Sequence, residues 1–428
     1  IIKKIGGKMK NRNFGIAILA FLFSILSSFA QKVTIQESTE MAFKNNKSIK
    51  VQMIEVERSK IKVDKAWKNA FFNVSYSASA NRYFKEIAST NQSYSHSVTL
   101  AQPLYTGGSI QSGIKIGKSS LDLAELNLEK TKKDIILSTV QAYINVYDAQ
   151  NTLDVYTVSK KALDKNYEIQ KEKYKLRLVT RPELLESERS VKDMEANIIS
   201  QKATVEINKE TLGNLIGMKG SDIEIVPFGV NEKFTNLVNF KEDLEKLKVS
   251  NTEYQIALKS KEIAKENINI EKADLKPVIT GTVTYGTLSS QSKLSELSKT
   301  ENYNGAIGVN FSWNLFDWGS RKLDVKDAEK NHESIGIQAE QVLDNLKVNL
   351  KNIYYKIQSL EKSLEALKTA VEVSEETYEL ETERYNNRLI TLNDLLKAES
   401  NLRQARTNYL SSRLNYYYLV SQYGSLLD

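Results

Sequence analysis

Side chains that could carry out acid–base, nucleophilic or metal chemistry are few and scattered in this 428-residue sequence. The chain has no cysteine, which excludes disulfides, thiolate metal sites and cysteine nucleophiles. Its two histidines, His96 and His332, lie in different predicted elements, and no nucleophile elbow or phosphate-binding loop occurs. The many carboxylates and amines follow helical spacing, as solvated helix faces do. The sequence therefore predicts no catalytic residue, no metal site and no cofactor.

The most informative pattern is a repeat with a spacing of 211 residues. The segment Tyr174–Leu185 aligns with Tyr385–Leu396, and the same shift places Tyr143 on Tyr354. Two further pairs of segments share this register without a gap. Chance matches would scatter, so the repeat indicates that a unit of about 200 residues is present twice.

Residues 1–30 have the composition of an N-terminal extension and a secretory signal peptide. Lys10 and Arg12 precede an apolar run over residues 14–26, and small residues follow. An uncleaved anchor is the alternative, although this run is shorter than the roughly 20 residues that a membrane span needs. Translation is expected to begin at Met9. Removal of the segment takes five basic residues with it and lowers the net charge from +7 to +2, which does not favour nucleic acid as a partner.

Each copy is predicted to contain a long helical hairpin. Apolar residues over 339–378 alternate spacings of three and four, which is the seam of a coiled coil, and residues 135–167 repeat it more loosely. Short turns near 177–183 and 388–394 should end these rods, and a second seam follows each turn. Polar cap residues at the restarts support these turn positions.

Each copy also carries two segments in which apolar and small polar residues alternate. Strands are expected at about 72–84 and 93–105, and again at about 278–288 and 302–316. An apolar face opposite a small polar face is typical of outer-membrane barrel strands, with lipid outside and water inside. The aromatic girdle expected at the membrane interface consists of Tyr105, Tyr303, Trp313, Phe316 and Trp318.

Four strands cannot close a membrane barrel by themselves. Single-chain barrels begin at eight strands, and open edges leave unpaired backbone groups in lipid. Two copies of the chain would give eight strands and three would give twelve. Small inward side chains leave room for a lumen, which favours three copies.

The chain is thus expected to contain an extension with a signal peptide (1–30), a first copy (31–217), a connecting or equatorial segment (218–240) and a second copy (241–428). This order resembles the TolC-like outer membrane efflux proteins over nearly the whole chain after residue 30. The most specific motifs are the two turn segments and the strand exits Gln102–Gly108 and Trp313–Gly319.

The resemblance implies a mainly α fold with membrane β strands. It implies a homotrimer with a shared twelve-stranded β-barrel in the outer membrane of a Gram-negative bacterium, and a long periplasmic α-helical coiled-coil barrel. The expected partners are outer-membrane lipid, a periplasmic adaptor (membrane fusion) protein and an inner-membrane transporter. The implied function is passive export of drugs, metals or secreted proteins, through a tripartite efflux or type I secretion system and without any chemistry.

The resemblance also assigns roles near the periplasmic tips. Asp394 matches an acidic position of the pore constriction, which Glu183 and Lys397 would share, with Lys397 replacing a second acid. Asp394 could equally serve as a helix N-terminal acid favoured by the dipole. Tyr385 and its counterpart Tyr174 match a latch that holds the tip closed, and Glu183 stands where the acidic partner of Tyr385 belongs. The residues expected to contact the adaptor are Arg177, Leu178, Val179, Thr180, Arg388, Leu389, Ile390 and Thr391, with arginine replacing the family's tip glycine in both turns.

Other classes fit the sequence less well. A periplasmic adaptor-like protein would usually have one hairpin between glycine-rich β-domains, whereas this chain has two hairpins and few glycines. A structural coiled-coil protein without a pore would not need paired amphipathic strands at matching positions in both copies. A hydrolase is the most remote alternative.

Overall fold

The computed structural model describes residues 31–87, 90–229, 234–236, 238–287, 291 and 293–427. The expected signal peptide over residues 1–30 lies outside this set. The chain divides into two compact units. Unit 1 comprises Lys132–Phe240 and Leu350–Leu426 together with the segment up to Lys47, and unit 2 comprises Ser48–Thr131 and Lys241–Asn349 with the last two residues.

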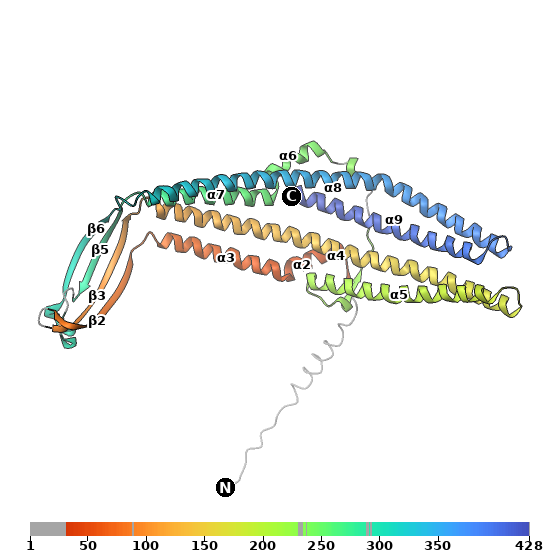
Figure 1. The fold of residues 1–428 in the computed structure, drawn as a ribbon, viewed down its shortest axis with the longest axis horizontal. Helices are drawn as coiled ribbons and strands as arrows, with labels where there is room; N and C mark the ends of the chain where they lie inside the picture. The colour runs from red at the N-terminus through yellow and green to blue at the C-terminus, as the bar shows by residue number, and fades with distance from the viewer. Residues whose placement is uncertain are drawn as a thin grey trace, which may run out of the picture. The chain divides into compact units, whose positions relative to one another are not determined.

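Helix lengths confirm the internal duplication (Figure 1). Helices α4 (Ser109–Lys175) and α8 (Ser320–Asn386) have 67 residues each, and α5 (Arg181–Ile216) and α9 (Leu392–Leu427) have 36 each. Both pairs begin and end 211 residues apart, which is the spacing of the sequence repeat. These uninterrupted helices are those that the heptad pattern predicts.

The shorter helices follow the same duplication with a different spacing. Helices α2 (Ile35–Asn45) and α6 (Phe240–Ser250) have 11 residues each, and α3 (Lys47–Lys68) and α7 (Thr252–Ala273) have 22 each. These pairs lie 205 residues apart. The six extra residues therefore enter the second copy after its first strand, in the connection that carries the short helices η3 and η4. Among the described residues, no helix is both long and apolar enough to span a bilayer.

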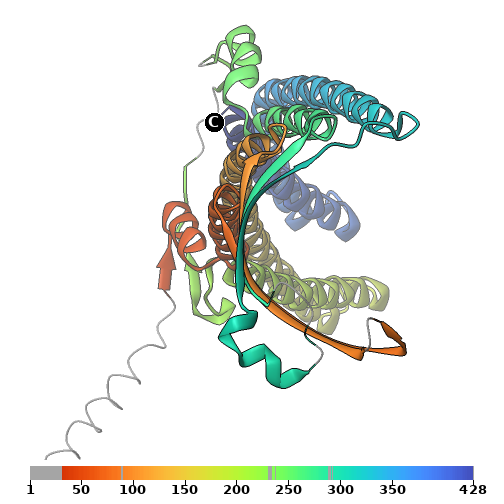
Figure 2. The same cartoon turned by 90° about the vertical axis from the view of Figure 1, so that its left-hand side faces the viewer.

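Unit 2 contains one antiparallel sheet in the order β2-β3-β5-β6, and the four strands lie side by side (Figure 2). Their bounds are Asn73–Ile87, Thr90–Tyr105, Val278–Gly286 and Asn304–Ser312. Strands β2 and β3 extend further toward the turn that joins them than the predicted bounds of about 72–84 and 93–105. Strand β6 ends at Ser312 instead of 316, because the chain turns there toward α8.

The strand register confirms the predicted separation of apolar and polar faces. One row across the sheet is Val74, Leu100, Val283 and Ile307, and the next row is Ser75, Thr99, Thr284 and Ala306. The apolar face stays uncovered, since the side chain of Ile307 is 87% exposed. An exposed apolar face of this kind marks a surface that contacts a membrane or a partner.

Unit 1 contains a small parallel sheet that joins β1 (Gln31–Val33) to β4 (Ile223–Ile225). Tyr143 of α4 is fully buried beneath it. The Tyr143 hydroxyl lies 2.9 Å from the carbonyl oxygen of Val33 and 2.7 Å from that of Val226, and it accepts a bond from the amide of Val226 at 3.0 Å. Burial raises the pKa of Tyr143 to about 12. The side chain of Tyr143 therefore links the ends of β1 and β4 to α4 through hydrogen bonds.

A second attachment in unit 1 holds the connecting segment to the other hairpin. Tyr416 of α9 accepts a bond from the amide of Phe234 at 3.0 Å and donates to Glu361 of α8 at 2.9 Å. Glu361 also accepts from the amide of Thr235 at 2.8 Å. The segment between the copies is therefore bonded to helices of both copies.

Replacing Tyr143 by phenylalanine should remove the hydroxyl that satisfies these strand ends. Because the carbonyl and amide groups stay buried, we expect the free energy of unfolding to fall by about 1–3 kcal/mol. The measurement is thermal unfolding of the purified protein, followed by circular dichroism. Tyr355→Phe is the matched control, since Tyr355 is 60% exposed. Equal melting temperatures for the two variants would contradict this role of the hydroxyl.

Candidate functional site

The candidate site is formed by the two hairpin tips of unit 1, and both use the same helix ending. In the first tip, the amide of Leu178 donates to the carbonyl of Lys173, and the amide of Arg177 donates to that of Tyr174, both at 2.9 Å. Arg177 adopts the left-handed conformation with φ of 60°. This is the Schellman arrangement, in which a left-handed residue satisfies the last carbonyls of a helix.

The second tip repeats this geometry 211 residues later. The amide of Leu389 donates to the carbonyl of Arg384 at 2.9 Å, and that of Arg388 donates to the carbonyl of Tyr385 at 3.0 Å. Arg388 has φ of 62°. Arginine therefore occupies, in both tips, a conformation that glycine adopts without steric cost.

Each returning helix begins with a reciprocal cap. The carboxylate of Glu183 accepts bonds from the amide and hydroxyl of Thr180 at 2.7 and 2.9 Å, and the carboxylate of Asp394 does the same with Thr391 at 3.0 and 2.7 Å. In return, the amide of Asp394 donates to the threonine hydroxyl at 3.3 Å. Both acids named as constriction residues are thus capping-box residues within the chain.

The hydrogen bonds from Thr391 hold the pKa of Asp394 below its ordinary value of 3.8, and the charges of Lys397 and Arg384 add to this effect. A lowered pKa means that the carboxylate is charged at neutral pH. The cap is complete above the ordinary aspartate pKa and weakens as the pH falls through the lower folded value. Asp394 and Lys397 are both exposed, so their charges reach the solvent.

Tyr385 is bonded to the other copy's hairpin through Gln170 of α4, a residue that the resemblance does not single out. Gln170 is fully buried, and its side-chain amide donates to the Tyr385 hydroxyl. The ammonium group of Lys173 lies 4.7 Å from the centre of the Tyr385 ring. Burial raises the pKa of Tyr385, and the nearby charge of Glu183 adds to the rise. Glu183 therefore acts on Tyr385 through its charge, while Gln170 makes the bond.

A second polar contact joins the hairpins further from the tips. The hydroxyl of Ser159 on α4 donates to the carboxylate of Glu399 on α9, which is 8% exposed. Arg403 lies 3.8 Å from the same carboxylate. Beside this carboxylate is a cavity of about 490 Å³ that is lined by both polar and apolar side chains. No cluster suited to a metal ion occurs in the part of the chain that the structure describes.

The spacing of the apolar seam of α4 indicates that Ser159 and Gln170 face another helix. Ser159 follows Tyr156 by three residues, and Gln170 follows Tyr167 by three, so both fill slots of the apolar seam. A polar residue in a seam position often sets the register of packed helices, because it needs one particular partner. The partners lie on the other hairpin, and the sequence pattern does not identify them.

The predicted aromatic girdle divides between two ends of the sheet. At one end the Tyr303 hydroxyl lies 3.1 Å from Nε2 of His96, and the rings of Tyr76 and Tyr285 lie 6.1 Å from the His96 ring and 5.7 Å from the Tyr303 ring. At the other end are the remaining predicted residues, whose exposed fractions are 43% for Tyr105, 49% for Trp313, 70% for Phe316 and 90% for Trp318.

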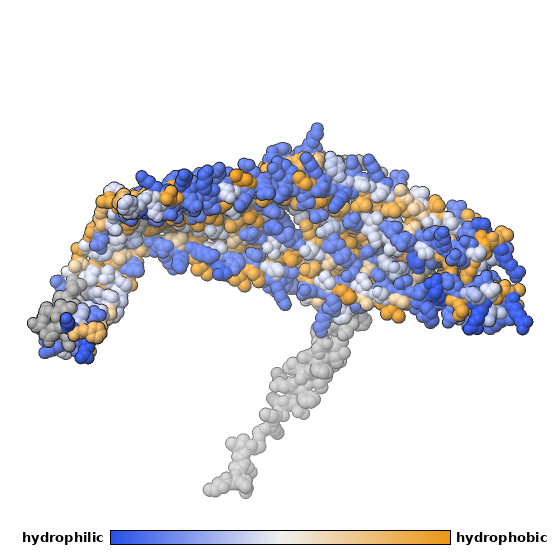
Figure 3. Space-filling model, viewed as in Figure 1, coloured by the Kyte–Doolittle hydropathy of each residue, from blue (hydrophilic) through white to orange (hydrophobic). Residues whose placement is uncertain are grey.

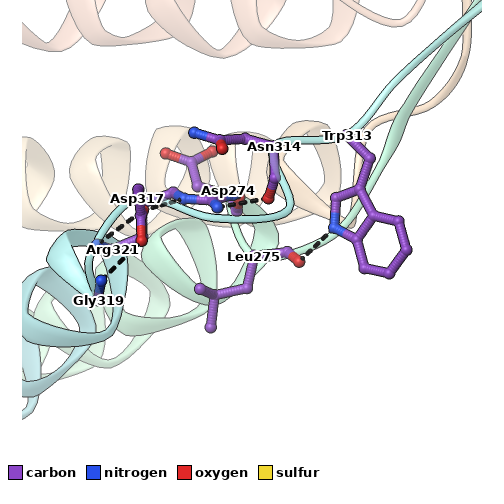
Figure 4. A network of polar contacts seen from close by, with 7 residues as sticks. All are labelled: Asp274, Leu275, Trp313, Asn314, Asp317, Gly319 and Arg321. Atoms are coloured by element: carbon purple, nitrogen blue, oxygen red, sulfur yellow. Dashed lines mark hydrogen bonds and ion pairs between the residues drawn. The ribbon is translucent and has the colours of Figure 1, made fainter.

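An ion pair anchors the second of these ends where β6 passes into α8 (Figure 4). The guanidinium of Arg321 bonds the carboxylate of Asp317 at 2.6 Å, donates to the carbonyl of Asp274 at 2.6 Å and also donates to that of Asn314. Asp317 in turn accepts from the amide of Gly319 at 3.0 Å. One side chain thereby ties the end of α7, the strand exit and the start of α8 together.

The two predicted latch tyrosines differ in their surroundings. The Tyr385 side chain is buried against Gln170, whereas Tyr174 is 37% exposed.

The substitution Tyr385→Phe leaves the amide of Gln170 buried without its partner, which should lower the stability of the tip by about 1–3 kcal/mol. We expect hydrogen exchange of the tip amides to become about tenfold faster in Tyr385→Phe and to remain unchanged in Tyr174→Phe. Equal exchange in both variants would contradict the bond to Gln170.

Several solved structures with the same fold are outer membrane proteins. The chain is similar to VceC from Vibrio cholerae (18% identity, TM-score 0.78, 92% of this chain and 95% of that chain). It is also similar to the Campylobacter jejuni CmeC outer membrane channel (17% identity, TM-score 0.77, 92% of this chain and 85% of that chain). A third similar structure is the open state of the Neisseria gonorrhoeae MtrE outer membrane channel (19% identity, TM-score 0.75, 92% of this chain and 88% of that chain).

No curated protein matches the sequence of the chain. The sequence profile of the family described as outer membrane efflux protein matches residues 39–218 and 244–418. These two ranges fall in the two copies, so each copy matches the family by itself. They also contain both hairpin tips and all four strands. The chain therefore belongs to the outer membrane efflux protein family, whose members are channels and not enzymes.

Proposed function

We propose that the protein is the passive exit duct of a tripartite efflux or type I secretion system. Three copies would share one twelve-stranded barrel in the outer membrane, and their long helices would form a periplasmic tunnel. A periplasmic adaptor would join the tunnel to an inner-membrane transporter that supplies the energy. The four-stranded sheet with two open edges is the observation that supports this proposal most strongly.

The edges of the sheet are β2 and β6, each of which has a single neighbour. In lipid, every unpaired backbone group costs several kcal/mol, so both edges need partner strands. The exposed apolar face fits the lipid side, and the small polar face fits a water-filled lumen. Joining β2 of one copy to β6 of the next satisfies both edges and closes the barrel when three copies meet.

Helix surfaces also leave apolar side chains for a partner copy to cover. On the face shown in Figure 3, hydrophobic residues are scattered among hydrophilic ones along the helices. Ile61 of α3, Ile199 of α5 and Ile337 of α8 are 65%, 70% and 60% exposed. Burying such side chains between protomers is favourable by about 25 cal/mol per Å² of apolar area.

The tips would form the narrow periplasmic end of the duct. In a trimer, three Asp394 carboxylates would surround the pore, with Lys397 and Glu183 close by. Tyr385, held by Gln170, would act as the latch that keeps the tip closed. The turn residues over 177–180 and 388–391 would contact the adaptor.

The first experiment is to measure the native mass of the detergent-extracted protein, together with its membrane fractionation. We expect a trimer in the outer-membrane fraction that conducts ions in a planar bilayer. A water-soluble monomer would contradict the proposal, since four strands with open edges cannot form a pore alone.

Asp394→Asn should lower the ratio of cation to anion permeability by a factor of roughly 2 to 10, because it removes three charges from the constriction. Single-channel reversal potentials in a salt gradient measure this ratio. Thr391→Ala is the matched control, since it weakens the cap and leaves the carboxylate in place. An unchanged permeability ratio in Asp394→Asn would contradict the proposal that three Asp394 carboxylates surround the pore. An equal change of the ratio in Thr391→Ala would show that the effect comes from the helix cap.

A further inference from the structure

We propose that the tips recognise a partner turn in which carboxylates flank an apolar residue, and that Arg177 and Arg388 bind these carboxylates. The inference rests on the proposed function, since the partner is the adaptor that docks on the duct. It adds the chemistry of that adaptor's contact turn, which should be acidic.

The backbone at both arginines supports a role outside the chain. A left-handed conformation costs a residue with a Cβ atom about 1–2 kcal/mol relative to the right-handed one, and glycine avoids this cost. Both copies keep arginine at this position, with φ of 60° and 62°. Non-glycine residues held in sparsely populated backbone conformations are concentrated at binding, catalytic and switch sites.

The hydrogen bonds of the turns need only the backbone of these residues. The Schellman bonds come from main-chain amides, which glycine would supply equally well. No ion pair or side-chain hydrogen bond of Arg177 or Arg388 is present among the described residues, and both side chains are exposed. The two guanidinium groups therefore remain available to a ligand.

Most neighbouring charges are already engaged. Glu172 pairs with Lys175 at 2.6 Å, and Glu381 pairs with Arg384 at 2.7 Å. The capping acids accept bonds from their threonines, and Lys173 lies over the Tyr385 ring. Among the carboxylates described near the second tip, Glu383 in the last turn of α8 makes no ion pair. Each tip thus presents a free arginine, and the first tip adds Arg181.

The residue after each arginine supplies the apolar part of the site. Leu178 is 52% exposed and Leu389 is 68% exposed. A guanidinium presents planar paired donors that match a carboxylate, and the adjacent leucine can pack on an aliphatic side chain. Because the two tips repeat the same arginine–leucine pair, one acidic, leucine-containing turn would fit both of them.

The test uses the purified full-length trimer and three synthetic helical hairpins that differ only in their turn. The turns read Glu-Leu-Glu, Gln-Leu-Gln and Arg-Leu-Arg. We expect the glutamate hairpin to bind about tenfold more tightly than the glutamine hairpin in a biosensor assay at low salt, and to lose this advantage as salt screens the charges. Equal binding of all three, or preference for the arginine hairpin, would overturn the inference.

Substitutions at Arg177 and Arg388 test whether these two arginines cause the preference for the glutamate hairpin. The double variant Arg177→Gly with Arg388→Gly keeps the turn and relieves the strain, so it should fold and lose the preference for glutamate. The double variant to glutamate should instead prefer the arginine hairpin. Arg189→Gln, which alters an arginine on α5 that is paired with Glu186, should bind as the unaltered protein does. If the glycine variant still prefers glutamate, other cations are responsible and the inference is wrong.

Native mass and bilayer conductance of the same preparations separate the two proposals. A conducting trimer without a preference for the acidic hairpin overturns this inference and leaves the proposed function intact. A protein that is neither trimeric nor conducting overturns the proposed function, and the inference falls with it.

Discussion

The pairing of backbone groups at the edges of the sheet is the constraint on which the rest of this molecule depends. The order β2-β3-β5-β6 leaves one open edge in each copy of the repeat. Water can satisfy such edges in solution, but lipid cannot. In the proposed trimer, strands from other copies would pair with both edges, and the exposed apolar face would contact lipid.

The long helices are joined by a few polar contacts in otherwise apolar seams. Apolar seams bind strongly but allow helices to slide, because leucine packs almost equally well in several registers. Ser159 and Gln170 remove this freedom, since each is buried and bonded to one residue of the other hairpin. The same contacts fix the level of the two tip turns relative to each other.

The duplicated copies are equivalent in backbone and different in chemistry. Gln102 donates to the carbonyl of Ala70 at 3.0 Å, and its counterpart Trp313 donates to that of Leu275 at 3.1 Å. The same bond is therefore made by an amide in one copy and by an indole in the other. Gly107 and Trp318 share a left-handed backbone, but a Cβ atom at Gly107 would meet the carbonyl oxygen of Ala273 at 2.5 Å. The bond made by Gln102 and Trp313 is present in both copies, although the side chains that make it differ.

The sequence by itself determined the elements of this protein, because these depend on local and periodic interactions. Heptad spacing defined the long helices, alternation defined the two faces of each strand, and the 211-residue register defined the equivalence of the copies. The capping role of Asp394 was also readable, as one of two alternatives, since Thr391 lies three residues before it.

Tertiary structure decided the contacts between residues that are far apart in the chain. The Tyr385–Gln170 bond joins residues 215 positions apart, and no local pattern links them. The left-handed backbone at Arg177 and Arg388 was equally hidden, because arginine ordinarily avoids that conformation. Beyond the end of β6 at Ser312, Arg321 bonds to Asp317 and to the end of α7 where the chain turns away from the sheet, and these contacts also join segments that are distant in sequence.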